Sequence, residues 1–89
     1  MLQPVVIDGI RTPIGKLNGA MKDIQPEEIA AFLLQKICER SHFDTRLLDA
    51  VILGQAKQSS DQPNIARLAA LMTKFPLEVQ AYTVHRQCG

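Results

Sequence analysis

The residue whose type and place could do chemistry is Cys88, which follows an alternating stretch at residues 79–86 and precedes Gly89. A thiol at the end of a strand becomes a nucleophile when a helix begins directly after it. The helix start supplies partial positive charge and free N–H groups. Both lower the pKa of a thiol and stabilise a developing oxyanion. A small residue such as Gly89 would let an acyl group approach closely. The alternative is a small buried side chain, the usual role of a free cysteine, and position alone leaves both open.

Metal binding is the next chemistry to consider, because the chain has two cysteines and two histidines. Cys38 and His42 are close in sequence, as are His85 and Cys88, but the separation between the pairs is far larger than in a small zinc module. Cys38 also falls on the apolar face of a predicted helix. We therefore expect no metal site, and two cysteines are too few for a disulfide framework.

Arg11 follows an apolar run and could bind a phosphate. A loop arginine more often bonds carboxylates or backbone carbonyls, so we predict a structural role and an ion pair with Asp8. Pro13 and nearby glycines predict one long ordered loop over residues 11–24. Loops of this length are uncommon unless they are functional or cover something.

The composition excludes several classes of partner. Among 89 residues, ten Lys and Arg face nine Asp and Glu, a net charge of +1, which gives no reason to expect nucleic acid or an anionic membrane. No apolar run approaches the roughly 20 residues that cross a bilayer. The first residues lack the features of a signal peptide. We expect a cytoplasmic protein with no membrane partner.

The elements that must position Cys88 alternate between strand and helix. In chain order they are a buried strand at residues 4–10, a helix at about 26–40, a turn or short helical segment at 44–49, a buried strand at 50–54, a polar loop at 55–63, a helix capped by Asn64 or Asp61 and ending near Lys74, and a strand at 79–86. The second helix is predicted to place Ile65, Leu68, Ala69 and Met72 on one face.

This order predicts an α/β fold with three mainly parallel strands and two crossover helices. In such sheets, ligands bind beyond the carboxyl ends of the strands. Those ends are residues 9–11, 54–55 and 87–88. Periodicity alone therefore places Cys88 at the functional edge of the sheet.

Four motifs occur in the order and spacing seen in thiolases, and the resemblance spans the whole chain. They are Arg11-Thr12-Pro13-Ile14-Gly15 with Gly19, Val51-Ile52-Leu53-Gly54-Gln55, Asn64-Ile65-Ala66-Arg67-Leu68-Ala69-Ala70, and Val84-His85-Arg86-Gln87-Cys88-Gly89. The chain thus resembles the amino-terminal part of an acetyl-CoA acyltransferase subunit. The resemblance implies that residues 1–89 are an amino-terminal fragment of a thiolase N-terminal domain, an incomplete half of that fold with exposed apolar surface.

The resemblance also implies a function. Cys88 matches the cysteine that takes up the acyl group as a thioester, in the Claisen condensation of two acyl-CoA molecules or the thiolysis of 3-ketoacyl-CoA in fatty acid metabolism. Coenzyme A thioesters are then substrates, no cofactor is required, and the complete enzyme is a homo-oligomer. The activating histidine and the second cysteine of the family lie in later parts of its subunit. We therefore expect the 89-residue chain alone to be inactive.

Two alternatives stay open. The chain could be a non-catalytic, truncated thiolase-like module that acts as a structural or interaction unit, or part of another condensing enzyme such as a ketoacyl synthase. The loop at residues 11–15 favours thiolase over the second. One position departs from the family, because His85 stands where asparagine or a small polar residue is usual. We predict a strand-interior or interface histidine that points away from the face of Cys88.

Overall fold

The first regular element of the computed structural model, which describes residues 2–58 and 63–88, is helix α1 (Pro26–Arg40). Pro26 occupies the first turn, where a missing N–H costs nothing. Glu27 and Glu28 follow there, where the helix dipole favours negative charge. The helix ends as Ser41 donates from its backbone N–H to the carbonyl of Ile37 at 3.0 Å. The predicted bounds of this helix are confirmed.

Two parallel strands, β1 (Ala50–Gly54) and β2 (Gln80–Val84), form the sheet. Their register runs from Ala50 opposite Gln80 to Gly54 opposite Val84. The short 3-10 helix η1 (Thr45–Leu47) precedes β1 and lies within residues 44–49, where a turn or short helical segment was predicted. The α/β class is confirmed, and β1 has its predicted bounds. The strand predicted over 79–86 exists, but it begins one residue late, at Gln80, and ends two residues early, at Val84.

Helix α2 (Ile65–Leu71) is shorter than predicted, and its inward face agrees with the prediction at Ile65 and Ala69 but not at Leu68 and Met72. Its buried residues are Ile65, Ala66, Ala69 and Ala70. The predicted face included Leu68 and Met72, but Met72 is 49% exposed. The physical reason is the small size of Ala66, Ala69 and Ala70, which lets the helix approach both strands closely. The residues nearest the strands are therefore the buried ones, although larger side chains lie elsewhere on the helix. Asn64 is the observed cap, and the other predicted cap, Asp61, lies outside the described residues.

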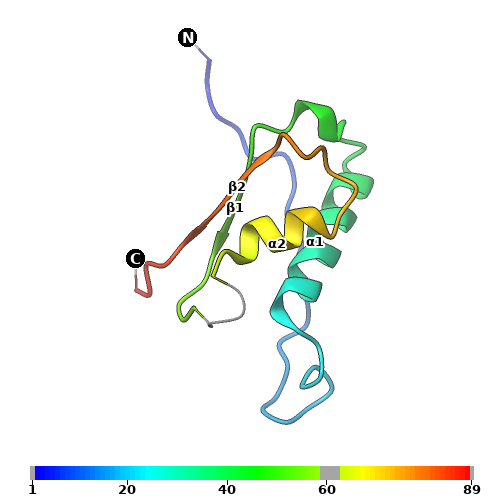
Figure 1. The fold of residues 1–89 in the computed structure, drawn as a ribbon. Coiled ribbons are helices and arrows are strands. Elements are labelled where there is room, and N and C mark those ends of the chain that lie inside the picture. Colours follow the sequence, from blue (N-terminus) through cyan, green and yellow to red (C-terminus); the bar gives the residue numbers. More distant parts are fainter. Residues whose placement is uncertain (1, 59–62, 89) are drawn as a thin grey trace.

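The elements stack in one direction away from the sheet (Figure 1). Helix α2 packs on both strands, and α1 packs on α2. The core lies where these elements meet. It consists of buried Val51, Ala70, Phe75 and Val79, with Leu34, Cys38, Leu48 and Ala81 packed against it.

The apolar run at residues 4–10 is not a strand, and this corrects the prediction of three strands. Val6 in this run is 94% exposed. Asp8 accepts a hydrogen bond from the N–H of Gly9 at 2.8 Å and pairs with Arg40 at the end of α1, at 3.2 Å. The run is therefore tied to α1 rather than paired with β1. A β-branched apolar sequence indicates a preference for extended backbone, but strand formation also needs a partner's N–H and C=O groups.

Apolar surface is exposed in the described chain, as expected. The large hydrophobic side chains that are more than nine-tenths exposed are Leu2, Val6, Ile14 and Leu17. No helix among residues 2–58 and 63–88 is long and apolar enough to cross a membrane.

Arg67 connects α2 by hydrogen bonds to the segment that leads into β2. Its guanidinium donates to the carbonyl of Val79 at 3.1 Å and to that of Leu77 at 3.3 Å. Val79 is 5% exposed, so water cannot readily replace this donor.

We predict that Arg67→Met lowers the free energy of unfolding by about 1–3 kcal/mol, because a buried carbonyl loses its partner. Urea denaturation followed by circular dichroism measures the change. The control is Lys74→Met at an exposed position near the end of α2, which should change stability by less than about 0.5 kcal/mol. Equal losses in the two variants would contradict the role given to Arg67.

Candidate active site

Cys88 lies four residues beyond the end of β2, in a turn, with an exposed side chain. Because β1 and β2 are parallel, Gly54 and Val84 end at the same edge of the sheet. The N–H of Gln55 donates to the carbonyl of Val84 at 3.0 Å, so the pairing continues one step past the strands. Cys88 therefore follows, by four residues, the strand that ends at the carboxyl edge of the sheet. Gly89 lies outside the described residues, so its predicted role stays a prediction.

The remaining predicted edge segment also comes close to this edge. Ile10 lines a hollow together with Leu53 and Gly54 at the end of β1. Its neighbour Arg11 donates to the backbone carbonyl of Thr12 at 3.0 Å. The predicted bonding to a backbone carbonyl is confirmed, whereas the predicted ion pair with Asp8 is wrong, because Asp8 pairs with Arg40.

His85 follows β2 directly and is exposed. A strand-interior histidine is therefore wrong, because β2 stops at Val84; an interface role stays a prediction. Within the described residues, neither histidine hydrogen-bonds to the sulfur of Cys88. Among the same residues, no group of three or more His, Cys, Asp or Glu side chains could hold a metal ion.

The second cysteine has a different environment. Cys38 lies on α1, partly buried against the core, and both cysteines are free. Burial raises the pKa of the Cys38 thiol because the thiolate loses hydration. The helix-face position predicted for Cys38 is confirmed, and its chemistry is that of a core side chain.

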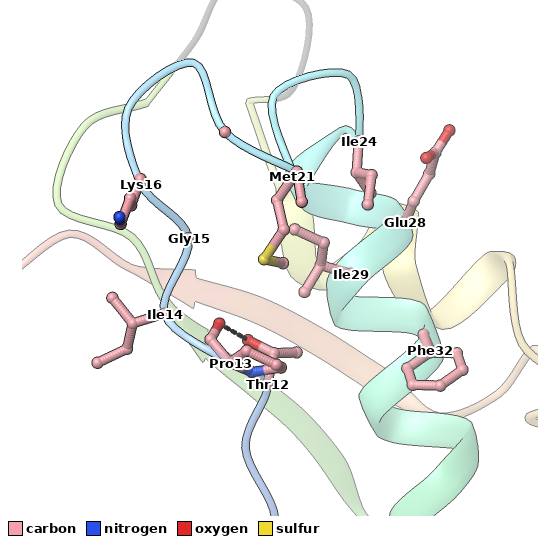
Figure 2. A pocket seen from close by; sticks show the side chains of 12 residues that line it. Thr12, Pro13, Ile14, Gly15, Lys16, Met21, Ile24, Glu28, Ile29 and Phe32 are labelled. Atoms are coloured by element: carbon pink, nitrogen blue, oxygen red, sulfur yellow. Dashed lines mark hydrogen bonds between the residues drawn. The ribbon is translucent and has the colours of Figure 1, made fainter.

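The loop at residues 11–24 contains no helix or strand, as predicted, and borders an apolar hollow. This hollow of about 690 Å³ lies between the loop and α1 (Figure 2). The residues that line it include Pro13, Gly15 and Ile24 of the loop and Ile29 and Phe32 of α1. Cys88 does not line it, so the hollow is separate from the candidate nucleophile.

Gly19 closes the turn in this loop, and its motif position has a steric reason. Its N–H donates to the carbonyl of Lys16 at 2.9 Å, and Asn18 takes a φ of 57°. A Cβ on Gly19 would lie 2.9 Å from the carbonyl oxygen of Lys16, closer than atoms of this kind approach. Only glycine closes the turn without moving the backbone.

One feature near the site was missed from sequence: the contact between β2 and the start of α2. The hydroxyl of Thr83 donates to Oδ1 of Asn64 at 2.8 Å and accepts from the N–H of Ala66 at 3.1 Å. The same Oδ1 accepts from the N–H of Arg67 at 3.2 Å. The signals in the sequence were Asn64 as a helix cap and the hydroxyl of Thr83, which shares a face of β2 with Ala81.

The fold matches one class of protein, the thiolases. The sequence profile of the family described as "Thiolase, N-terminal domain" matches residues 4–89, and the chain belongs to the thiolase family.

Relatives of known name agree. The chain is 38% identical over 91 residues to the 3-oxoadipyl-CoA/3-oxo-5,6-dehydrosuberyl-CoA thiolase of Escherichia coli K12, covering 100% of this chain and 23% of that protein. It is 39% identical over 92 residues to the 3-ketoacyl-CoA thiolase of Pseudoalteromonas atlantica, covering 100% of this chain and 24% of the other. The chain thus spans about a quarter of the length of these relatives.

A solved structure supports the fold. The crystal structure of the Bacillus anthracis acetyl-CoA acetyltransferase superposes with a TM-score of 0.80 at 43% sequence identity, covering 86% of this chain and 20% of that one. The arrangement of two helices on two parallel strands is therefore a partial thiolase fold.

We predict that the two thiols differ in reactivity with iodoacetamide at neutral pH. Cys88 is exposed and should be alkylated first, whereas Cys38 is partly buried with a raised pKa and should react only at higher pH. Peptide mass spectrometry of samples quenched over time separates the two sites. Faster modification of Cys38 would contradict the environments described for the two thiols.

Proposed function

We propose that Cys88 is the nucleophile of an acyl-CoA thiolase and that it accepts the acyl group as a thioester. The observation that carries the proposal is the place of Cys88: an exposed thiol just past β2, at the carboxyl edge of a parallel sheet, in a chain of the thiolase family. The names of the relatives, which act on CoA thioesters, support the substrate class.

In the proposed reaction, the Cys88 thiolate attacks the thioester carbonyl of an acyl-CoA. A bond forms between the carbonyl carbon and Sγ, the bond to the coenzyme A sulfur breaks, and coenzyme A leaves as a thiolate that takes up a proton. In condensation, a second acyl-CoA loses an α-proton to a base of the complete subunit, and the resulting carbanion attacks the carbonyl carbon of the acyl-cysteine. A carbon–carbon bond forms and the Cys88 thiolate is released. Thiolysis of 3-ketoacyl-CoA is the same sequence in reverse.

The proposal concerns the complete subunit. Nucleophilic catalysis by a thiol needs a nearby base and donors for the oxyanion. Within residues 2–58 and 63–88, neither histidine hydrogen-bonds to the sulfur of Cys88. The relatives are about four times as long, since the chain covers 23% of the first of them. The expectations of a homo-oligomeric, cytoplasmic enzyme remain part of this proposal.

We predict that Cys88→Ala in a complete subunit abolishes the release of coenzyme A from acetyl-CoA in a single turnover, because no acyl acceptor remains. A thiol-reactive dye measures the released coenzyme A. The matched control is Cys38→Ala, which removes a thiol from the core and should keep turnover within about tenfold of the parent. A burst of coenzyme A from Cys88→Ala equal to that of the parent would refute the proposal.

We also predict that the 89-residue chain alone does not cleave acetoacetyl-CoA. The expected result is a rate at the level of the buffer, measured by loss of absorbance of the Mg²⁺–enolate. Folding of the purified chain is checked first by circular dichroism, so that inactivity is not confused with unfolding. Turnover near that of a whole thiolase would show that residues 1–89 are sufficient for catalysis.

A further inference from the structure

The junction between α2 and β2 satisfies helix donors with a side chain from the strand. A helix begins with N–H groups that have no partner within it. In α2, the N–H of Arg67 is satisfied by the cap Asn64, at 3.2 Å, in the usual way. The N–H of Ala66 is instead satisfied by the hydroxyl of Thr83, at 3.1 Å, 17 residues further along the chain. Ala66 is 0% exposed, so water cannot take the place of this hydroxyl.

Thr83 is thereby held on three sides. It pairs with Leu53 of β1 in the sheet register, accepts from Ala66, and donates to Oδ1 of Asn64 at 2.8 Å. Asn64 adds a bond from its Nδ2 to the carbonyl of Ala81 at 3.3 Å. The side chains of these two residues fix the end of β2 relative to both β1 and α2.

The end of β2 is also where the chain departs toward Cys88. Val84 is the last residue of the strand, and Cys88 follows four residues later in a turn. This short segment starts from the backbone of Val84, so its starting point is fixed by the end of β2. A shift of β2 along α2 would therefore displace the sulfur of Cys88.

We propose that Thr83 and Asn64 are positioning residues for the nucleophile: their hydrogen bonds across the α2–β2 junction hold the exit of β2 so that Cys88 meets the thioester carbonyl in a reactive geometry. This inference rests on the proposed role of Cys88. Reaction rates are sensitive to such placement, since a displacement of about 1 Å can cost about 10²-fold.

The test compares three variants of Thr83 and Asn64 in a complete thiolase subunit that carries this segment. Thr83→Val keeps the shape and the strand preference of the side chain but removes both hydroxyl bonds. Thr83→Ser keeps the hydroxyl. Asn64→Ala removes the acceptor of the Thr83 proton while leaving the bond from Ala66 to Thr83 possible. The readout is the rate of acyl-enzyme formation with saturating acetyl-CoA, followed by rapid quench and mass spectrometry of the folded protein.

A matched control comes from the other end of the same helix. The hydroxyl of Thr73 donates to the carbonyl of Ala70 at 2.6 Å and accepts from the N–H of Phe75 at 3.3 Å. Thr73→Val thus removes the same number of bonds by the same substitution, beyond the C-terminal end of α2 and outside the junction with β2. It reports what a loss of stability alone does to acylation.

We expect Thr83→Val to slow acylation by about tenfold or more and Asn64→Ala to slow it less. Thr83→Ser should keep the parent rate of acylation. Thr73→Val should also acylate at the parent rate, despite a lowered melting temperature. Should Thr83→Val fail to fold, Asn64→Ala against Thr73→Val decides the matter in the same way. Acylation in Thr83→Val and Asn64→Ala no slower than in Thr73→Val would overturn the inference. That result would leave the proposed function standing, because the Cys88→Ala variant tests the nucleophile separately.

Discussion

The parallel pairing of β1 with β2 is the constraint on which the rest of the described structure depends. It sets Gly54 and Val84 at one edge, and thereby brings the segments after both strands together. Helix α2 can cover both strands closely because three of the four buried residues on its inward face are alanines. Ala66 and Ala69 are both 0% exposed, so the backbone of the helix lies close to the sheet. Larger side chains there would separate the layers and open the core around Val51 and Val79.

Because α2 packs closely on the sheet, the N–H groups of its first turn are buried and need hydrogen-bond acceptors from the protein. The hydroxyl of Thr83 meets that requirement at Ala66, and the guanidinium of Arg67 meets the corresponding need of carbonyls ahead of β2. The first contact joins α2 to β2, and the second joins α2 to the segment that leads into β2. The position of Cys88 is in this way linked to the packing of α2 through hydrogen bonds, as well as through the strand itself.

Local signals in the sequence were sufficient for the elements whose ends are chemically marked. Pro26 and the two glutamates mark the start of α1, and Arg40 marks its end, so both bounds were predicted. The run at residues 4–10 was misassigned because its sequence carries a preference for extended backbone but no information on the partner strand. On α2, Leu68 and Met72 were wrongly predicted to be buried, because close packing on two strands favours alanine at the buried positions beside Ile65.

In the candidate site, too, some features could be predicted from the sequence and others could not. Cys88 could be predicted from strand order and from resemblance, since both depend on position in the chain. The bond between Thr83 and Asn64 could not, because it joins residues 19 apart whose meeting depends on how α2 packs on the sheet.

The measurement that tests the central claim most directly is tandem mass spectrometry of a complete subunit quenched in acid after mixing with acetyl-CoA. The account predicts a 42 Da acetyl group on the peptide that contains Cys88, about the mass that replacement of a thiol hydrogen by acetyl adds in nucleophilic catalysis. An acetyl group on the Cys38 peptide alone, or on neither, would contradict it.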